Sequence, residues 1–406
     1  MTSAPPGVRN LLRAAMVIFV ITVVIGILNG TDLWDPPRNT LLTHVHSGTL
    51  GWITLSVFAA SIWMFGGGGK ADAGRLPTFA IIAIALYVLA FWSGDLFNTV
   101  ESIQRPIGGT LAFIAMAWMF VWVMKSKRGA KWNVAEFGMG LALAFLVFGA
   151  VLGVLLGLQL ADVEIVSPEN ASRLGSSHPG SMVVGFVVLA GLALIEWLMP
   201  GRRIPMLSES RSGMIQMLLL FAAGLIFVGG ELIGNEELLQ LAVPLQVVGA
   251  LILLFRFRRE LAPSQWGGVV VNRYVRTSVL GFVVVVVLIA YLIGQIIALG
   301  EAPTEENFAD LLPVVVAMNH VNFIMVMTNL ILAMMILSTA SRESTGKLIY
   351  WGVNVGVVGF AIGLITESAE LKRVFTPILG LALLYAIYTY FTAEPAPEPE
   401  LATAEM

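Results

Sequence analysis

Twelve apolar stretches, each close to the length of a membrane-spanning helix, divide this sequence almost from end to end. Crossing the roughly 30 Å hydrocarbon core of a bilayer takes about 20 predominantly apolar residues in helical conformation. Such stretches occupy residues 13–31, 40–65, 76–94, 107–124, 135–160, 177–199, 212–234, 238–255, 277–299, 312–338, 348–366 and 374–392. The chain is 57% hydrophobic and only 12% charged, which excludes an ordinary soluble domain. The sequence therefore predicts an all-α integral membrane protein of about twelve transmembrane helices.

Basic residues indicate the orientation of these helices, because Lys and Arg concentrate in cytoplasmic loops. With a cytoplasmic N-terminus, 18 of the 23 basic residues fall inside, and the outer loops hold only Arg38, Arg105, Arg173, Lys372 and Arg373. We therefore expect a multi-pass protein of the cytoplasmic (inner) membrane of a prokaryote, with both termini in the cytoplasm. Residues 393–406 are rich in Pro, Glu and Ala, which predicts a disordered cytoplasmic tail.

The four histidines of the chain are its main chemical signal. His44, His46, His178 and His320 each lie near the outer end of a predicted helix. Ionisable side chains within a bilayer are costly and usually functional. The chain has no cysteine, which excludes thiolate ligands, iron–sulfur clusters and haem attached through a Cys-x-x-Cys-His motif. The set therefore predicts a metal or haem site held mainly by imidazoles, although hydrogen-bonded interfacial histidines are the simpler alternative.

The spacing of these histidines indicates internal repetition. His46, His178 and His320 are 132 and 142 residues apart, close to one third of the chain. Each falls on the second helix of a four-helix block, with blocks at residues 13–124, 135–255 and 277–392. Small residues after His46 and His178 would let a neighbouring helix or a flat macrocycle approach the backbone closely. Residues 1–392 are therefore expected to form a single domain of three pseudo-symmetric four-helix arcs.

The string His44-Val45-His46-Ser47-Gly48-Thr49-Leu50-Gly51-Trp52 resembles the helix-ten motif of C-type haem-copper oxidases. The segment from His178 to Phe186 is similar to helix six of the same superfamily, where a histidine binds copper. In that family, subunit I has twelve helices in three arcs, and histidines of helices two and ten clamp the low-spin haem. The resemblance implies a respiratory electron-transport subunit of the terminal oxidase or nitric oxide reductase type. It also implies haem b as cofactor, accessory subunits, and an outer-face electron donor such as a cytochrome c or a cupredoxin.

The sequence departs from this family at its copper site. The seventh predicted helix, residues 213–234, has no histidine where the family places a pair, so a complete copper centre cannot be built. Four imidazoles can instead make two six-coordinate haems, or one such haem with a five-coordinate haem or a weaker metal site. Residues two apart on a helix point about 200° from each other, so His44 and His46 serve different neighbours. We expect His46 and His320 to clamp one haem b, and His44 and His178 to serve a second haem or metal.

Two functions follow from this pattern. The first is a haem b-binding protein that transfers electrons, with oxygen or nitric oxide chemistry near the outer face. Glu231, the most interior carboxylate, is a candidate for proton relay there, unless it is simply hydrated. The alternative is a small-molecule or ion transporter without a redox cofactor, although transporters usually place polar groups near the midplane. Membrane lipid is an expected partner, and no basic stripe with interleaved aromatic residues indicates nucleic acid.

Overall fold

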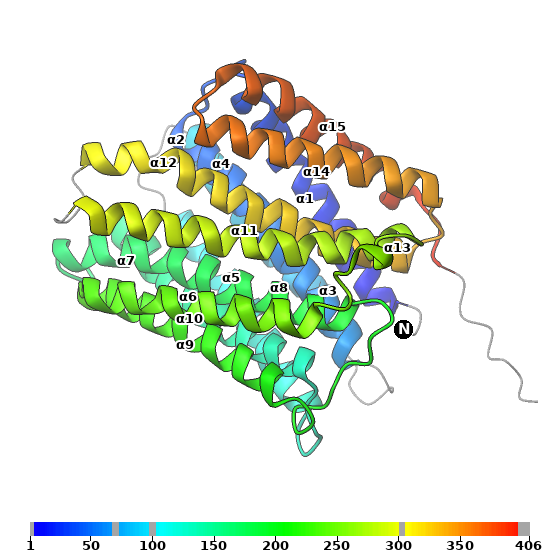
Figure 1. Cartoon of the computed structure of the whole chain (residues 1–406). Coiled ribbons are helices and arrows are strands. Elements are labelled where there is room, and N and C mark those ends of the chain that lie inside the picture. Colours follow the sequence, from blue (N-terminus) through cyan, green and yellow to red (C-terminus); the bar gives the residue numbers. More distant parts are fainter. Residues whose placement is uncertain (1–3, 67–72, 97–102, 300–304, 397–406) are drawn as a thin grey trace, which may run out of the picture.

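The computed structural model describes residues 4–66, 73–96, 103–299 and 305–396 of the chain. In this part the protein is all-helical, with twelve spans long and apolar enough to cross a membrane (Figure 1). The predicted fold class is thereby confirmed. The only bridges between extended segments in these ranges are Asn133 with Met206 and Thr339 with Pro395. Most of the predicted disordered tail, residues 397–406, lies outside the described residues.

Nine of the twelve described spans are single helices. They are α1 (Pro6–Gly30), α4 (Leu76–Leu96), α5 (Gln104–Ser126), α6 (Val134–Leu160), α9 (Arg211–Ile233), α10 (Glu236–Phe257), α11 (Val270–Leu299), α14 (Glu343–Ile365) and α15 (Ala369–Thr392). Several extend beyond their apolar stretch because polar residues cap them. At the start of α6, Asn133 and Glu136 each accept a hydrogen bond from the other's backbone N–H.

The second, sixth and tenth spans are composite, because a π-helical stretch interrupts each of them. The second span comprises α2 (Arg38–His46), η1 (Ser47–Thr54) and α3 (Leu55–Phe65). The sixth and tenth consist of α7 (Pro168–Gly180), η2 (Ser181–Val187), α8 (Val188–Leu198), and of α12 (Glu305–His320), η4 (Val321–Thr328), α13 (Asn329–Ser338). A short 3₁₀ turn, η3 (Pro263–Gln265), lies between α10 and α11.

These three composite spans form the centre of the molecule. In their most apolar windows 83%, 78% and 78% of the residues are buried, against 22–56% in the other nine described spans. The π-helical stretches meet there: η4 contacts both η1 and η2, and the Trp52 indole N–H donates to Thr328 Oγ1 at 2.9 Å. The spans that carry the histidines are therefore shielded by the other helices.

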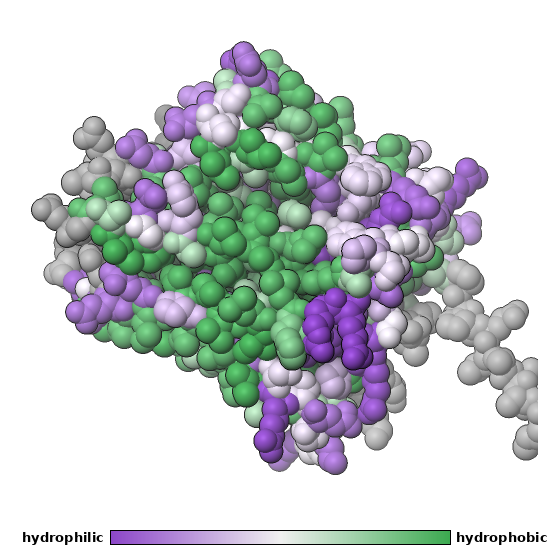
Figure 2. All heavy atoms as spheres, viewed as in Figure 1, coloured by the Kyte–Doolittle hydropathy of each residue, from purple (hydrophilic) through white to green (hydrophobic). Residues whose placement is uncertain are grey.

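The outer surface of the bundle fits a lipid environment. Figure 2 shows a broad hydrophobic band across the middle of one face, with hydrophilic residues gathered toward its two ends. Large apolar side chains such as Leu251, Val287 and Leu381 are exposed on the peripheral helices. Contiguous exposed apolar surface of this kind requires a nonpolar neighbour, which for membrane-spanning helices is lipid.

The composite spans all begin on the side of the bundle opposite the N-terminus (Figure 1). We call this side, which carries the starts of α2, α7 and α12, the histidine side. The opposite side, which carries the N-terminus and the end of α15, is called the terminal side.

Candidate functional site

All four histidines lie on the histidine side, at or just before a π-helical stretch. His46 and His320 immediately precede η1 and η4, whereas His178 lies three residues before η2. Stretches of π-helix are rare and are frequently found at functional sites. No residue pattern predicts them, since their apolar residues fit an α-helix equally well.

Each imidazole is oriented through its Nδ1 atom. His44 Nδ1 lies 2.8 Å from the Thr22 carbonyl oxygen of α1, and His178 Nδ1 lies 2.9 Å from the Gly149 carbonyl oxygen of α6. We call these two the cross-helix histidines. His46 and His320 are the same-helix histidines, because their Nδ1 atoms bond the carbonyl four residues earlier, of Leu42 and Val316, at 2.8 Å.

These bonds determine the tautomer of the neutral rings. A carbonyl oxygen only accepts hydrogen bonds, so Nδ1 must carry the proton and Nε2 is left with its lone pair. Among the described residues, no hydrogen bond reaches any of the four Nε2 atoms. Metal-ligating histidines commonly have this arrangement, in which a carbonyl holds one nitrogen and the other binds the metal.

Two glycines make room for the cross-helix histidines. A Cβ atom at Gly26 would lie 3.1 Å from His44 Cε1, and a Cβ atom at Gly153 would lie 2.7 Å from His178 Cε1. Gly26 lies four residues, or one helical turn, after Thr22, whose carbonyl accepts the His44 hydrogen bond. Gly153 lies four residues after Gly149, whose carbonyl accepts the His178 hydrogen bond. The absence of a side chain therefore lets each ring rest directly on the neighbouring helix.

His44 and His320 form the closest described pair of histidines. Their ring centroids are 6.5 Å apart and their planes are inclined by 29°. Two imidazoles on opposite sides of one metal ion, each with a metal–nitrogen bond of about 2.0 Å, have centroids roughly 6 Å apart. The spacing therefore suits a shared metal or haem iron. The sequence interpretation paired His320 with His46, whereas this geometry favours His44.

His46 has different surroundings. Its ring stacks on Phe91 of α4 with centroids 3.9 Å apart, and Tyr87 makes an edge contact with it at 5.7 Å. The guanidinium of Arg105 lies 5.0 Å from the Phe91 ring centroid and bonds the side chain of Asn39.

Buried amide atoms without partners flank His320. In the described structure, Asn319 Oδ1 and both amide atoms of Asn322 are buried and make no hydrogen bond. A buried polar atom left in this state costs about 1–3 kcal/mol, so water or a polar part of a ligand is expected beside it. The ring of Phe360 from α14 packs on His320 with centroids 5.0 Å apart.

Glu231, the candidate for proton relay, lies half-buried in the last turn of α9. No described hydrogen bond or ion pair connects its carboxylate to a histidine. Its role therefore stays a prediction. Nor do the described residues bring together three or more His, Asp or Glu side chains that could hold a metal ion. A metal centre in this part of the chain thus depends on pairs of histidines.

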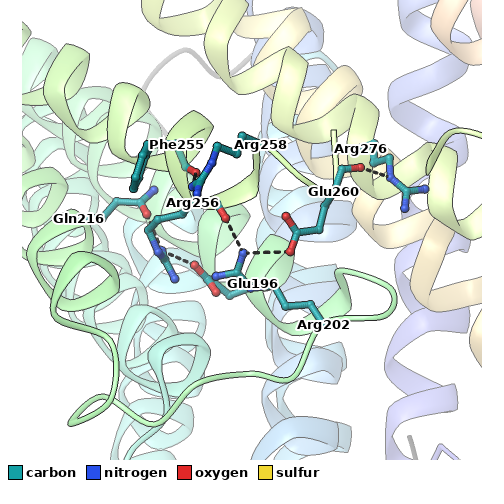
Figure 3. A network of polar contacts seen from close by, with 8 residues as sticks. All are labelled: Glu196, Arg202, Gln216, Phe255, Arg256, Arg258, Glu260 and Arg276. Carbon is teal, nitrogen blue, oxygen red and sulfur yellow. Dashed lines mark hydrogen bonds and ion pairs between the residues drawn. The ribbon is translucent and has the colours of Figure 1, made fainter. Parts of the chain in front are cut away.

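A second polar cluster lies on the terminal side of the bundle (Figure 3). Glu196 of α8 forms an ion pair with Arg256 of α10, and the two side chains are 1% and 3% exposed. Arg256 Nη1 also donates to Gln216 Oε1 of α9 at 2.6 Å, and Arg202 donates to the Arg256 carbonyl at 2.9 Å. The partner of Glu196 lies on another helix, which no local pattern reveals.

Comparisons with known proteins add no assignment, since no protein-family model and no curated protein matches this sequence. The chemistry of the molecule is therefore inferred from its own side chains. Among the described groups, the imidazoles with oriented Nδ1 atoms and available Nε2 atoms are the strongest candidates for binding a cofactor.

Proposed function

We propose that this protein binds haem b through His44 and His320 and transfers electrons near the outer face of the cytoplasmic membrane. The observation that carries the proposal is the 6.5 Å separation of the two rings on adjacent central spans. The two Nε2 lone pairs that the carbonyl bonds leave available support it further. Two neutral imidazoles are a suitable donor set for haem iron, which they would hold without adding charge to the apolar interior.

When bound there, haem supplies reversible one-electron transfer. The protein's own residues orient the ligands for it. The Thr22 and Val316 carbonyls fix the ring orientation and tautomer of His44 and His320, and Gly26 lets the edge of the His44 ring approach α1 closely. Phe360 covers one side of the His320 ring. Such supporting contacts hold the ligands in place and make them better donors.

The direction of electron delivery follows from the expected orientation. If the basic residues mark the cytoplasmic side, the histidine side faces outward, where a cytochrome c or a cupredoxin would deliver electrons. The haem-copper oxidases place two copper-binding histidines on their seventh helix, and α9, the seventh span here, has none. We therefore infer that the protein transfers electrons. Any oxygen or nitric oxide chemistry would require a haem with an open coordination position. The four histidines do not suit four-electron oxygen reduction at a haem–copper pair, because α9 has no histidines to bind the copper.

A visible spectrum tests the proposal. The protein is purified in detergent, haem and metals are quantified, and reduced-minus-oxidised spectra are recorded for wild type, His44→Ala and His320→Ala. Val45→Ala is the matched control, because Val45 adjoins His44 but its side chain is exposed. We expect sharp b-type bands that weaken in both histidine variants and persist in the control. A folded, colourless and metal-free wild type would reject haem binding and favour transport.

A further inference from the structure

The terminal side of the bundle has a groove between the beginning of α1 and the ends of α13 and α15. On α1 it is lined by Arg9, Leu12, Arg13 and Met16, which share one face of the helix because they lie three or four positions apart. The end of α13 and Tyr390 of α15 line it as well. We call this the terminal groove.

The segment that follows α15 fixes the walls of the terminal groove. Thr339, just after α13, forms an antiparallel bridge with Pro395, and the Ala340 N–H donates to the Glu394 carbonyl at 2.9 Å. Pro395 itself lines the groove. The ends of α13 and α15 are therefore tied together, and both lie against the face of α1 that carries the two arginines.

Two guanidinium groups of α1 are available to an anion. Arg9 is half-buried and Arg13 is exposed, and neither guanidinium forms a hydrogen bond or an ion pair with another described residue. Arg13 lies over the ring of Phe391, 5.8 Å from its centroid. Glu343, at the start of α14, already pairs with Lys347 at 3.5 Å. Because a partly buried charge normally has a partner of opposite charge, the two arginines predict an anion at the groove.

A buried hydroxyl in the same groove points to a ligand independently. Tyr390 is 2% exposed, and its hydroxyl has no hydrogen-bond partner in the described structure. The neighbouring hydroxyls of Ser338 and Thr339 are already used, since both donate to the Met335 carbonyl, at 3.0 and 2.8 Å. The cavity in the groove is about 20 Å³, enough for one water molecule. A water there can connect the Tyr390 hydroxyl to an anion beside the arginines.

The terminal groove adjoins the surface that faces lipid. Val17, one turn after Arg13 on α1, is 57% exposed, and Tyr388 near the end of α15 is 67% exposed. Exposed apolar side chains on a membrane-spanning helix face acyl chains, and tyrosines gather where these chains meet the headgroups. Arg13 therefore lies at the level of the lipid phosphates. With the expected orientation this is the cytoplasmic leaflet, whose anionic lipids attract basic residues close to the membrane.

We propose that the terminal groove binds the phosphate of an anionic phospholipid. Arg9 and Arg13 donate to the phosphate oxygens, and Tyr390 reaches them through one water. Two guanidinium groups favour a headgroup of net negative charge over one whose phosphate is balanced by an ammonium group. The groove lies on the side opposite the histidines, so this proposal stands or falls independently of haem binding.

Lipid binding to the purified, delipidated protein tests the proposal. Native mass spectrometry counts bound lipid, and thermal unfolding in detergent measures stabilisation, with phosphatidylglycerol, phosphatidylcholine and inorganic phosphate added separately. We expect phosphatidylglycerol to bind and to raise the Tm, and the other two to act much more weakly. Arg9→Gln and Arg13→Gln should each weaken phosphatidylglycerol binding about fivefold. Tyr390→Phe should weaken it by a similar factor, about fivefold, through the loss of one hydrogen bond.

Two matched controls lie outside the groove. Arg211→Gln removes an exposed arginine at the start of α9, and Tyr388→Phe removes an exposed hydroxyl two residues before Tyr390. Both controls should bind phosphatidylglycerol like wild type. Without lipid, Tyr390→Phe should unfold at the wild-type temperature, because its hydroxyl has no described partner to lose.

Three outcomes would overturn the proposal. Equal phosphatidylglycerol binding by wild type and all three groove variants would show that lipid binds elsewhere. Equal binding of phosphatidylglycerol and phosphatidylcholine would rule out selection for an anionic headgroup. Inorganic phosphate that binds as tightly as phosphatidylglycerol, and is lost in the arginine variants, would make the groove a site for free anions instead of lipid.

Discussion

At the scale of single residues, the carbonyl bond at Nδ1 is the most informative contact of each histidine. Here His44 and His178 reach across to a neighbouring helix, and a glycine on that helix leaves space for the ring. Binding of a cofactor should therefore be sensitive to small changes at these glycines.

Gly26→Ala should weaken the haem held by His44. The added Cβ atom would lie 3.1 Å from His44 Cε1, so the ring must shift and its Nε2 atom would move away from the iron. We expect reduced haem content or a shifted b-type band, measured by difference spectroscopy of the purified protein. Gly294→Ala is the matched control, because no atom lies near its Cβ position and helix propensity improves. Identical spectra for both variants would contradict a specific role for Gly26.

At the scale of helices, hydrogen bonds across the centre connect the composite spans. Thr328 both donates to the Phe323 carbonyl and accepts from the Trp52 indole N–H. Thr54 donates to Thr49 in the same way, but no described side chain donates to it. Thr54 and Thr328 are each the last residue of a π-helical stretch. Of these two hydroxyls, only that of Thr328 accepts a hydrogen bond from another span in the described structure.

Thr328→Val should destabilise the protein more than Thr54→Val. Valine has nearly the same shape, so the main loss is the partner of the Trp52 N–H, which is buried and would cost about 1–3 kcal/mol. Thermal unfolding in detergent, followed by tryptophan fluorescence, measures the difference. Thr49→Val serves as the control, because the Thr49 hydroxyl makes an exposed hydrogen bond to the Val45 carbonyl of its own helix. Equal losses for Thr328→Val and Thr54→Val would argue against this connection.

The ion pair between α8 and α10 belongs to the same scale. Replacing either partner leaves a buried charge unpaired, so Glu196→Gln and Arg256→Met should each cost about 3–5 kcal/mol. The double variant should regain part of this loss, because neither charge then remains. Arg373→Met is the surface control: its pair with Asp32 is about half exposed and should be worth at most about 1 kcal/mol. Additive losses in the double variant would show that the two charges act independently.

At the scale of the whole molecule, the sequence predicts its twelve spans well and its internal contacts poorly. Apolar length alone locates a helix, because a bilayer requires about 20 such residues. The pairing of His44 with His320 depends on how two distant spans pack, and the sequence interpretation therefore chose the neighbouring His46 instead. The π-helical stretches and the Glu196–Arg256 contact were missed for the same reason, since no local pattern of residues encodes them.

The expected orientation can be tested directly because the chain has no cysteine. Val163 follows α6 on the histidine side, and Glu209 precedes α9 on the terminal side; both are exposed. In intact cells, a membrane-impermeant maleimide should label Val163→Cys, and should label Glu209→Cys only after permeabilisation. The cysteine-free wild type gives the background. The opposite labelling pattern would place the histidine side in the cytoplasm.

The position of His44 and His46 on one helix has a consequence for energy coupling. Residues two apart differ by only about 3 Å along a helix axis, roughly a tenth of the hydrocarbon thickness. Two cofactors held by this pair would therefore lie at nearly the same depth. Moving an electron between them would involve only about 0.2 kcal/mol per 100 mV of membrane potential, against about 2.3 for a full crossing. Exchange between the two sites would run parallel to the membrane plane and be almost independent of the voltage that a respiring cell maintains.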